Sequence, residues 1–120
     1  MALLALVVAS PATSFACAKT KLASKHSDGT RGDDDSENVS ISGNGRYVAF
    51  HSDATNLVSN DTNGKKDVFV HDRKTGKTKR VSKRSNGTQG DGASFAPSIS
   101  DDGRYVAFYS GATNLVKDDT

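Results

Sequence analysis

Hydrophobic positions along this chain fall in short unbroken runs separated by polar turns. Two of these runs read Tyr-Val-Ala-Phe, at 47–50 and 105–108, and a third is Val68-Phe69-Val70. A strand with one face in water alternates apolar and polar residues, so unbroken runs indicate strands that are covered on both faces. No stretch after residue 18 has helical periodicity. The pattern therefore predicts an all-β fold.

The Tyr-Val-Ala-Phe run belongs to a segment that occurs twice. Gly-Arg-Tyr-Val-Ala-Phe stands at 45–50 and again at 103–108, and Ala-Thr-Asn-Leu-Val follows each copy. When Gly45 is aligned with Gly103, residues 27–62 and 85–120 are identical at 23 of 36 positions. Agreement over so long a window means that one structural unit is written nearly twice.

Four strands are predicted in each complete unit. In the first unit they cover about 37–42, 46–52, 67–71 and 77–83, and the second unit repeats the first two at 95–100 and 104–110. Asn44-Gly45 and Asp102-Gly103 precede the second strands and predict type I′ hairpin turns, in which both central residues have φ > 0. The order of strands and turns predicts four-stranded antiparallel sheets set in series.

A longer motif adds a family resemblance. Residues 97–108 read Pro-Ser-Ile-Ser-Asp-Asp-Gly-Arg-Tyr-Val-Ala-Phe. Together with the Ala-Thr-Asn-Leu-Val segments and residues 61–72, they resemble the WD-repeat-like blades of TolB-like β-propeller proteins over about 23–120. The first copy departs from the motif, with Asn38-Val39 where the second has Ala96-Pro97. The resemblance implies four-stranded antiparallel blades, commonly six in a ring, in exported proteins, and it implies no single activity.

The expected domain organisation follows from the repeat. Residues 1–18 are predicted as a signal peptide, 19–83 as a first propeller blade and 84–120 as a second, truncated blade. A propeller closes with roughly 4–8 blades, so fewer than two blades make an incomplete ring. We expect the N-terminal piece of a longer propeller or a truncated gene product. Self-assembly of several copies into a ring is the alternative.

The N-terminal residues predict export to the periplasm or the extracellular space. The apolar run at 2–9 has the length of a signal-peptide core and is too short to span a bilayer. Ala16-Cys17-Ala18 offers a cleavage site between small residues, and Ser14-Phe15-Ala16 offers a second one. No Lys or Arg precedes the run, as a signal peptide would normally have. The alternative is a buried N-terminal strand or helix.

Charge and composition bear on the expected partners. The 16 basic and 14 acidic residues give a formal net charge of +2, and they are interspersed, so no strong field for nucleic acid or a membrane surface is expected. Leu, Ile, Val and Phe are scarce, which suggests units that stack on neighbours. We expect protein partners held through the blade loops, with no nucleic acid and no membrane span.

One loop has the spacing of part of a calcium site. Ser59, Asp61, Asn63 and Asp67 offer oxygen ligands at alternate positions, and Gly64 allows a sharp bend. Two lysines, at 65 and 66, oppose cation binding. The alternative is an Asn-Gly turn that leads into a strand. We assign no metal to this loop.

The remaining candidates have structural explanations. Arg31-Gly32-Asp33 spells an adhesion tripeptide, but the second copy has Gln89-Gly90-Asp91, so Gly-Asp belongs to the repeat. His51 aligns with Tyr109, which predicts a flat ring between blades, and the other two histidines, His26 and His71, form no motif. We therefore assign no catalytic, cofactor-binding or metal-binding residue, and no cofactor.

The function expected from these observations is that of an exported, non-catalytic propeller segment that serves as a binding or protein-interaction scaffold. The alternative is the propeller portion of a larger hydrolase, similar to prolyl oligopeptidase, whose catalytic domain is absent from this chain. Such an enzyme needs a Gly-x-Ser-x-Gly nucleophile elbow, a motif that these 120 residues do not contain.

Overall fold

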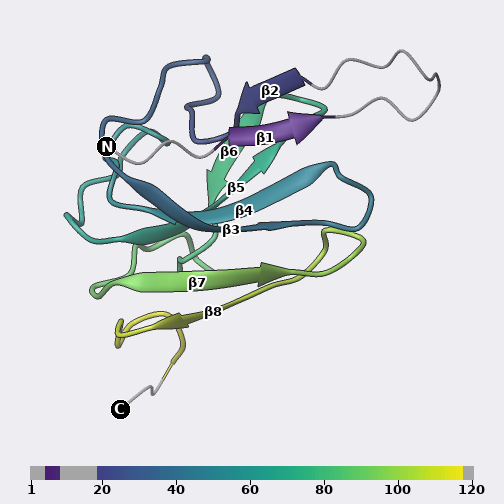
Figure 1. Cartoon of the computed structure of the whole chain (residues 1–120). Coiled ribbons are helices and arrows are strands. Elements are labelled where there is room, and N and C mark those ends of the chain that lie inside the picture. The colour runs from purple at the N-terminus through teal and green to yellow at the C-terminus, as the bar shows by residue number, and fades with distance from the viewer. Residues whose placement is uncertain (1–4, 9–18, 118–120) are drawn as a thin grey trace.

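A computed structural model describes residues 5–8 and 19–117 of the chain, and these residues form strands and no helix (Figure 1). The predicted all-β fold is confirmed. The strands of the described residues are β1 (Ala5–Val8), β2 (Lys19–Leu22), β3 (Ser36–Ile41), β4 (Tyr47–Ser52), β5 (Asp67–Asp72), β6 (Lys77–Arg80), β7 (Ser94–Ile99) and β8 (Val106–Ser110).

Strands β3 to β6 form one antiparallel sheet in which neighbours in sequence are neighbours in space. These are the four strands predicted for the first unit, although β6 ends at Arg80, earlier than the expected residue 83. The pairing of β5 with β4 is continuous, from Asp72 opposite Tyr47 to Asp67 opposite Ser52. The sheet is therefore an unbroken four-stranded meander.

Both faces of this sheet are covered, as its unbroken apolar runs predict. Figure 1 shows β1 and β2 on one side of the sheet and β7 and β8 on the other. On the first side, Phe50 and Phe69 stack with their ring centroids 5.9 Å apart, and Ala23, which follows β2, packs in the same cluster. On the second side, the ring of His51 accepts a hydrogen bond from the backbone of Ala96 in β7. The sheet is thus the middle of three layers.

The hydrophobic core lies between the sheet and the segment that follows β2. It is small, as the scarcity of aliphatic residues predicts, and consists of Ala23, Val48, Phe50, Ala54, Leu57 and Phe69, with Val58 packed against it. The Ala-Thr-Asn-Leu-Val segment contributes three of these residues. Each fully buried Val, Leu or Phe side chain contributes about 1.5–3 kcal/mol, so this cluster is the main source of stability in the first unit.

The hairpin turns differ from the type I′ prediction, which is wrong. Only the glycines, Gly45 with φ of 71° and Gly103 with φ of 74°, have left-handed backbone, while Asn44 and Asp102 do not. The N–H of Gly45 donates to the carbonyl of Ser42 at 2.8 Å, and the Asn44 side chain accepts from the N–H two residues on, at 3.0 Å. Because this side-chain bond holds the turn in place, only the glycine of each dipeptide needs a left-handed backbone.

A β-bulge stands at the same place in both units. The register of β3 on β4 shifts within the strand, and so does that of β7 on β8. Asn38 lies at the first shift with φ of 52°, and Ala96 lies at the second with φ of 54°. Asn tolerates this region better than other L-residues do. A bulge redirects the backbone, and here it aims the Ala96 N–H at His51, 3.0 Å away.

A two-stranded sheet lies at each end of the part of the chain that the structure describes. β7 pairs with β8 as β3 pairs with β4, so the second predicted unit, 84–120, contains the first half of the sheet found in the first unit. At the other end, Ala5–Val8 pairs antiparallel with β2. This strand lies within the predicted signal peptide, and the predicted cleavage sites lie outside the described residues. β2 belongs to the predicted first blade, 19–83, but it pairs with β1 and not with the four-stranded sheet.

Candidate functional site

The loop predicted as a partial calcium site is organised around an arginine. Nη1 of Arg80 lies 3.2 Å from Oδ1 of Asp61 and 3.3 Å from Oδ2 of Asp67, and all three side chains are almost completely buried. The guanidinium thus supplies the positive charge that a metal ion would bring to two buried carboxylates. Ser59 is exposed, and the side chain of Asn63 bonds the backbone. This arrangement favours the interpretation as a turn that leads into β5.

The Asp61 carboxylate is only partly satisfied. Burial, and then the neighbouring Asp67 carboxylate, raise the pKa of Asp61 to about 6, although Arg80 opposes the shift. Among the described residues, Oδ2 of Asp61 and Nε of Arg80 are buried without a hydrogen-bond partner. Asp67 is better satisfied, since it also accepts the hydroxyl of Ser82 at 2.8 Å. Two carboxylates share one guanidinium here, and Asp61 is the less satisfied of the two.

The same loop joins the two units through one glutamine. Oε1 of Gln89 accepts the backbone N–H groups of Thr62 and Asn63 at 3.0 and 3.1 Å, and Nη1 of Arg80 donates to the same oxygen at 3.0 Å. The amide nitrogen of Gln89 donates to the Thr62 hydroxyl at 2.8 Å. Because Gln89 belongs to the second unit, the loop works as a polar joint between the units.

The adhesion-like tripeptide is part of another internal joint. Its carboxylate, on Asp33, accepts the N–H of Thr55 at 2.7 Å and the Thr55 hydroxyl at 2.6 Å. The side chain of Asn56 accepts the N–H of Asp33 at 2.9 Å and donates to the carbonyl of Arg31 at 2.8 Å. The hydrogen bond from the Thr55 hydroxyl is the main cause that lowers the pKa of Asp33. The Asp33 carboxylate is thus engaged in holding its own loop.

This clamp occurs again in the second unit, which explains two blocks of the repeat at once. Asp91 accepts the N–H and the hydroxyl of Thr113 at 2.7 and 2.6 Å. Asn114 accepts the Asp91 N–H at 3.0 Å and donates to the Gln89 carbonyl at 2.8 Å. Gly-Asp and Ala-Thr-Asn-Leu-Val therefore occur together because their polar side chains bond each other. Arg31 contributes only its backbone to the bonds of the first clamp.

The histidines occupy different environments. His51 lies between β4 and β7, as the alignment with Tyr109 predicts, and its burial lowers its pKa. His71 is buried on the opposite face of the sheet, where Nδ1 lies 2.9 Å from the Thr78 hydroxyl. That hydroxyl donates to the Lys25 carbonyl, so Nδ1 of His71 carries the proton and donates to the Thr78 oxygen. Burial also lowers the pKa of His71, which keeps both rings neutral at pH 7.

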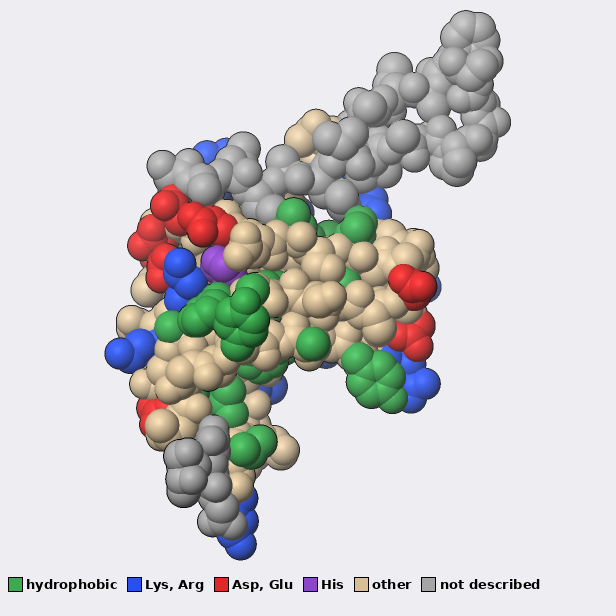
Figure 2. All heavy atoms as spheres, turned by 60° about the horizontal axis from the view of Figure 1, so that its bottom comes forward, with side chains coloured by type: hydrophobic (Ala, Val, Ile, Leu, Met, Phe, Trp, Pro, Cys, Tyr) green, Lys and Arg blue, Asp and Glu red, His purple; other side chains and the backbone are tan. Residues whose placement is uncertain are grey.

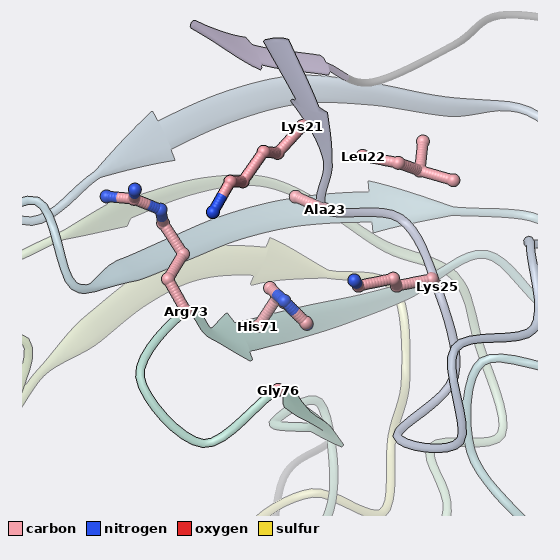
Figure 3. A pocket seen from close by; sticks show the side chains of 7 residues that line it. All are labelled: Lys21, Leu22, Ala23, Lys25, His71, Arg73 and Gly76. Atoms are coloured by element: carbon pink, nitrogen blue, oxygen red, sulfur yellow. The ribbon is translucent and has the colours of Figure 1, made fainter. Parts of the chain in front are cut away.

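A small cavity of about 120 Å³ lies between β2 and the end of β5 (Figure 3). Three basic side chains, Lys21, Lys25 and Arg73, line it around His71, and Leu22, Ala23 and Gly76 complete the lining. The cavity depends on the position of β2 against the sheet. The sequence does not predict that these basic residues lie together, because they come from segments that are far apart in the chain.

Similarity to known proteins does not assign a function to this chain. No family model, curated protein or solved structure matches the chain. Within residues 5–8 and 19–117, no helix is long and apolar enough to cross a membrane. The same residues contain no cluster of three or more His, Cys, Asp or Glu side chains that could hold a metal ion.

Proposed function

We propose that this chain is a segment of an exported β-propeller that serves as a binding or interaction scaffold and carries no chemistry of its own. The observation that supports this most strongly is the four-stranded antiparallel sheet, covered on both faces and half-repeated later in the chain. Radially repeated sheets of this kind are the building blocks of propellers. We call the four strands β3 to β6 the complete blade.

The proposed binding surfaces are the two ends of the blades, where loops gather. At one end, equivalent turns of the two units touch, since the N–H of Asn44 donates to the carbonyl of Asp101 at 3.3 Å. At the other end, the Asp33 and Asp91 clamps hold the loops of each unit in the same conformation. Rigid scaffolds that present ordered loops commonly bind partners through them.

A designed disulfide tests the proposed stacking of blades. A Cβ atom built on Gly43 would lie 3.0 Å from Cβ of Asp101, shorter than the usual 3.5–4.5 Å of a disulfide, so a small separation of the two turns brings the pair into range. We expect Gly43→Cys with Asp101→Cys to form an intramolecular disulfide in a Cys17→Ser background. The control places the first cysteine at Ser59, beyond the opposite end of β4. Equal oxidation of both variants, or none in the designed pair, would contradict the stacking.

Export and the absence of chemistry are tested separately. N-terminal sequencing of exported material should begin near Cys17 or Lys19, and an intact N-terminus on a cytosolic protein would contradict export. The purified chain should not hydrolyse ester or prolyl-peptide substrates. Hydrolysis that survives careful repurification would contradict the absence of chemistry in this chain.

A further inference from the structure

The small cavity beside His71 concentrates positive charge. Lys21, Lys25 and Arg73 line it, and among the described residues no acidic side chain does. Figure 3 shows Lys25 pointing toward His71 and Lys21 reaching into the same space from β2. On the face drawn in Figure 2, by contrast, basic and acidic side chains lie beside one another. Three cations around one hollow repel each other unless an anion joins them.

The cations of the cavity have no carboxylate partner in the described part of the chain. The ion pairs found there involve other basic groups. Asp72, which stands next to His71 in the sequence, is engaged by two hydrogen bonds from Arg46 at 2.9 and 2.8 Å. Arg73 donates through Nη1 to the backbone carbonyl of Gly45, a bond that holds its side chain and leaves its charge uncompensated. The positive charge of the cavity is therefore available to a ligand.

The segment that follows β2 is held against the complete blade by its own contacts. The hydroxyl of Thr78 donates to the carbonyl of Lys25, and the N–H of Thr78 donates to the hydroxyl of Ser27 at 3.0 Å. Ala23 is buried in the hydrophobic core. These contacts involve no residue before Ala23, and every lining residue follows the predicted cleavage sites. We therefore expect the cavity in the exported form as well as in the uncleaved chain.

His71 adds a hydrogen-bond acceptor to this basic cavity. Its Nδ1 donates to the Thr78 oxygen, so Nε2 of the neutral ring carries a lone pair. No hydrogen bond to Nε2 is seen within the described part of the chain. Burial, and then the charge of Lys25, lower the pKa of His71, and Arg73 adds to them while Asp72 opposes them. At pH 7 the ring is thus neutral, and its Nε2 accepts a hydrogen bond and cannot donate one.

We propose that this cavity binds hydrogen phosphate, the phosphate ion that carries two negative charges and keeps one proton at neutral pH. Lys21, Lys25 and Arg73 would donate to its charged oxygens, and its P–OH group would donate to Nε2 of His71. Sulfate has the same charge and shape but no proton, so it would leave Nε2 unpaired. A phosphate monoester, with a second pKa of about 6, has also lost this proton at pH 7.5. The inference goes beyond the proposed scaffold and does not depend on a propeller.

Calorimetric titration of the purified chain at pH 7.5 and low salt tests the site, with sodium phosphate, sodium sulfate and glycerol phosphate as ligands. We expect saturable binding of phosphate and an affinity for sulfate that is at least about tenfold lower. Glycerol phosphate, which stands for a phosphorylated partner, should bind as weakly as sulfate. As the pH falls below about 6, His71 gains a proton on Nε2 and can donate to sulfate. The affinity for sulfate should therefore rise on acidification.

The repeat supplies a matched pair of variants. Lys25 and Lys83 are separated by the same spacing as Gly45 and Gly103, and each forms an isolated bridge. Lys25 lines the cavity, whereas Lys83 does not. We expect Lys25→Met to weaken phosphate binding at least about tenfold and Lys83→Met to change it less than about twofold, because a charge-assisted hydrogen bond is lost only in the first.

The imidazole signals in NMR spectra locate the bound ion without any substitution, so the test holds even if a variant fails to fold. The chain has three histidines, and phosphate should shift the ring signals of His71 while those of His26 and His51 stay in place. No saturable phosphate binding, equal affinity for sulfate or glycerol phosphate, equal losses in the two lysine variants, or shifts confined to another histidine would each overturn the site.

Discussion

The chain presents the same six residues in two surroundings. Gly-Arg-Tyr-Val-Ala-Phe enters β4 in the complete blade, where Val48, Ala49 and Phe50 have no exposed surface. It enters β8 in the two-stranded sheet of β7 and β8, which we call the half-blade, where Ala107 is exposed and the flanking Val106 and Phe108 are partly exposed. The sequence and the hairpin are the same, so the difference comes from β5, β6 and the next sheet. A strand of this repeat is buried by its neighbours and not by itself.

The arginine of this segment shows the same dependence on neighbours. In the complete blade, Arg46 makes two hydrogen bonds to the Asp72 carboxylate, at 2.9 and 2.8 Å. Both arginines also lie over the ring of the tyrosine that follows them, but the strand that would carry a carboxylate for Arg104 is not among the described residues. Polar contacts, like apolar ones, are completed by the third strand.

Truncating the buried phenylalanine should produce the largest difference between the two surroundings. Phe50→Ala removes a ring that lies fully in the core, and we expect a loss of about 3–5 kcal/mol in the free energy of unfolding. Phe108→Ala removes a partly exposed ring and should cost less than half as much. Urea unfolding followed by circular dichroism measures both. Similar losses would mean that the half-blade is as well packed as the complete one.

Two glycines in equivalent turns sharpen the comparison at the contact between the units. Both have left-handed backbone, so Gly45→Ala should cost about 1–2 kcal/mol from strain alone. A Cβ atom on Gly103 would in addition clash with the ring of Tyr47. We therefore expect Gly103→Ala to cost about 2–4 kcal/mol in the same unfolding assay. Equal costs would show that the second turn does not pack on Tyr47.

The two bulges predict opposite effects of exchanging their residues. Ala96→Asn places a residue that tolerates positive φ where alanine is strained, and we expect a gain of about 0.5–1 kcal/mol. Asn38→Ala makes the reverse change and should lose a similar amount. Thermal unfolding of the two variants, with the double exchange as a control, measures this. A loss at Ala96 would contradict the left-handed conformation there.

The smallest effect is expected from the arginines, and it depends on pH. The Arg46 guanidinium holds the pKa of Asp72 well below its usual range. The stabilisation is therefore complete above about pH 4, the usual carboxyl range, and is lost as the pH falls toward the pKa of the folded state. Arg46→Lys should lower the urea midpoint at both pH 6 and pH 3, and the difference should shrink only as the pH falls below about 3 toward the pKa of folded Asp72. Arg104→Lys, which has no such carboxylate, should show no pH-dependent difference.

The strands could be predicted because their signals are local. Unbroken apolar runs and the alignment of the two hexapeptides located the four strands of the complete blade, and the pairing of His51 with Tyr109 in that alignment placed the ring between sheets. The turn type was missed because the bond of the Asn44 side chain, not the Asn-Gly pair alone, determines it. The strand at β2 was missed although Lys19-Thr20-Lys21 repeats Lys77-Thr78-Lys79. A short match of this kind is a weak signal until pairing shows that it is a strand.

The polar joints could not be predicted, because their partners are distant in the sequence. The sequence placed Asp61 and Asp67 in one loop with ligand spacing, but it did not show that Arg80 from β6 lies between them. The Gly-Asp and Thr-Asn blocks were visible as repeats, but only the fold brings Asp33 to Thr55. The basic cavity around His71 likewise depends on the position of β2.

Amide hydrogen exchange tests most directly whether neighbouring strands decide the burial of the repeated segment. Because the two hexapeptides are identical, the intrinsic exchange rates of their amides are closely matched, and any difference reports structure. The amides of Val48 to Phe50 have a strand on both sides, whereas alternate amides of Val106 to Phe108 face an edge that no described strand covers. Mass spectrometry of the exchanged chain compares the two segments. We expect exchange at least about tenfold slower in the first segment. Equal protection of both segments would contradict the account.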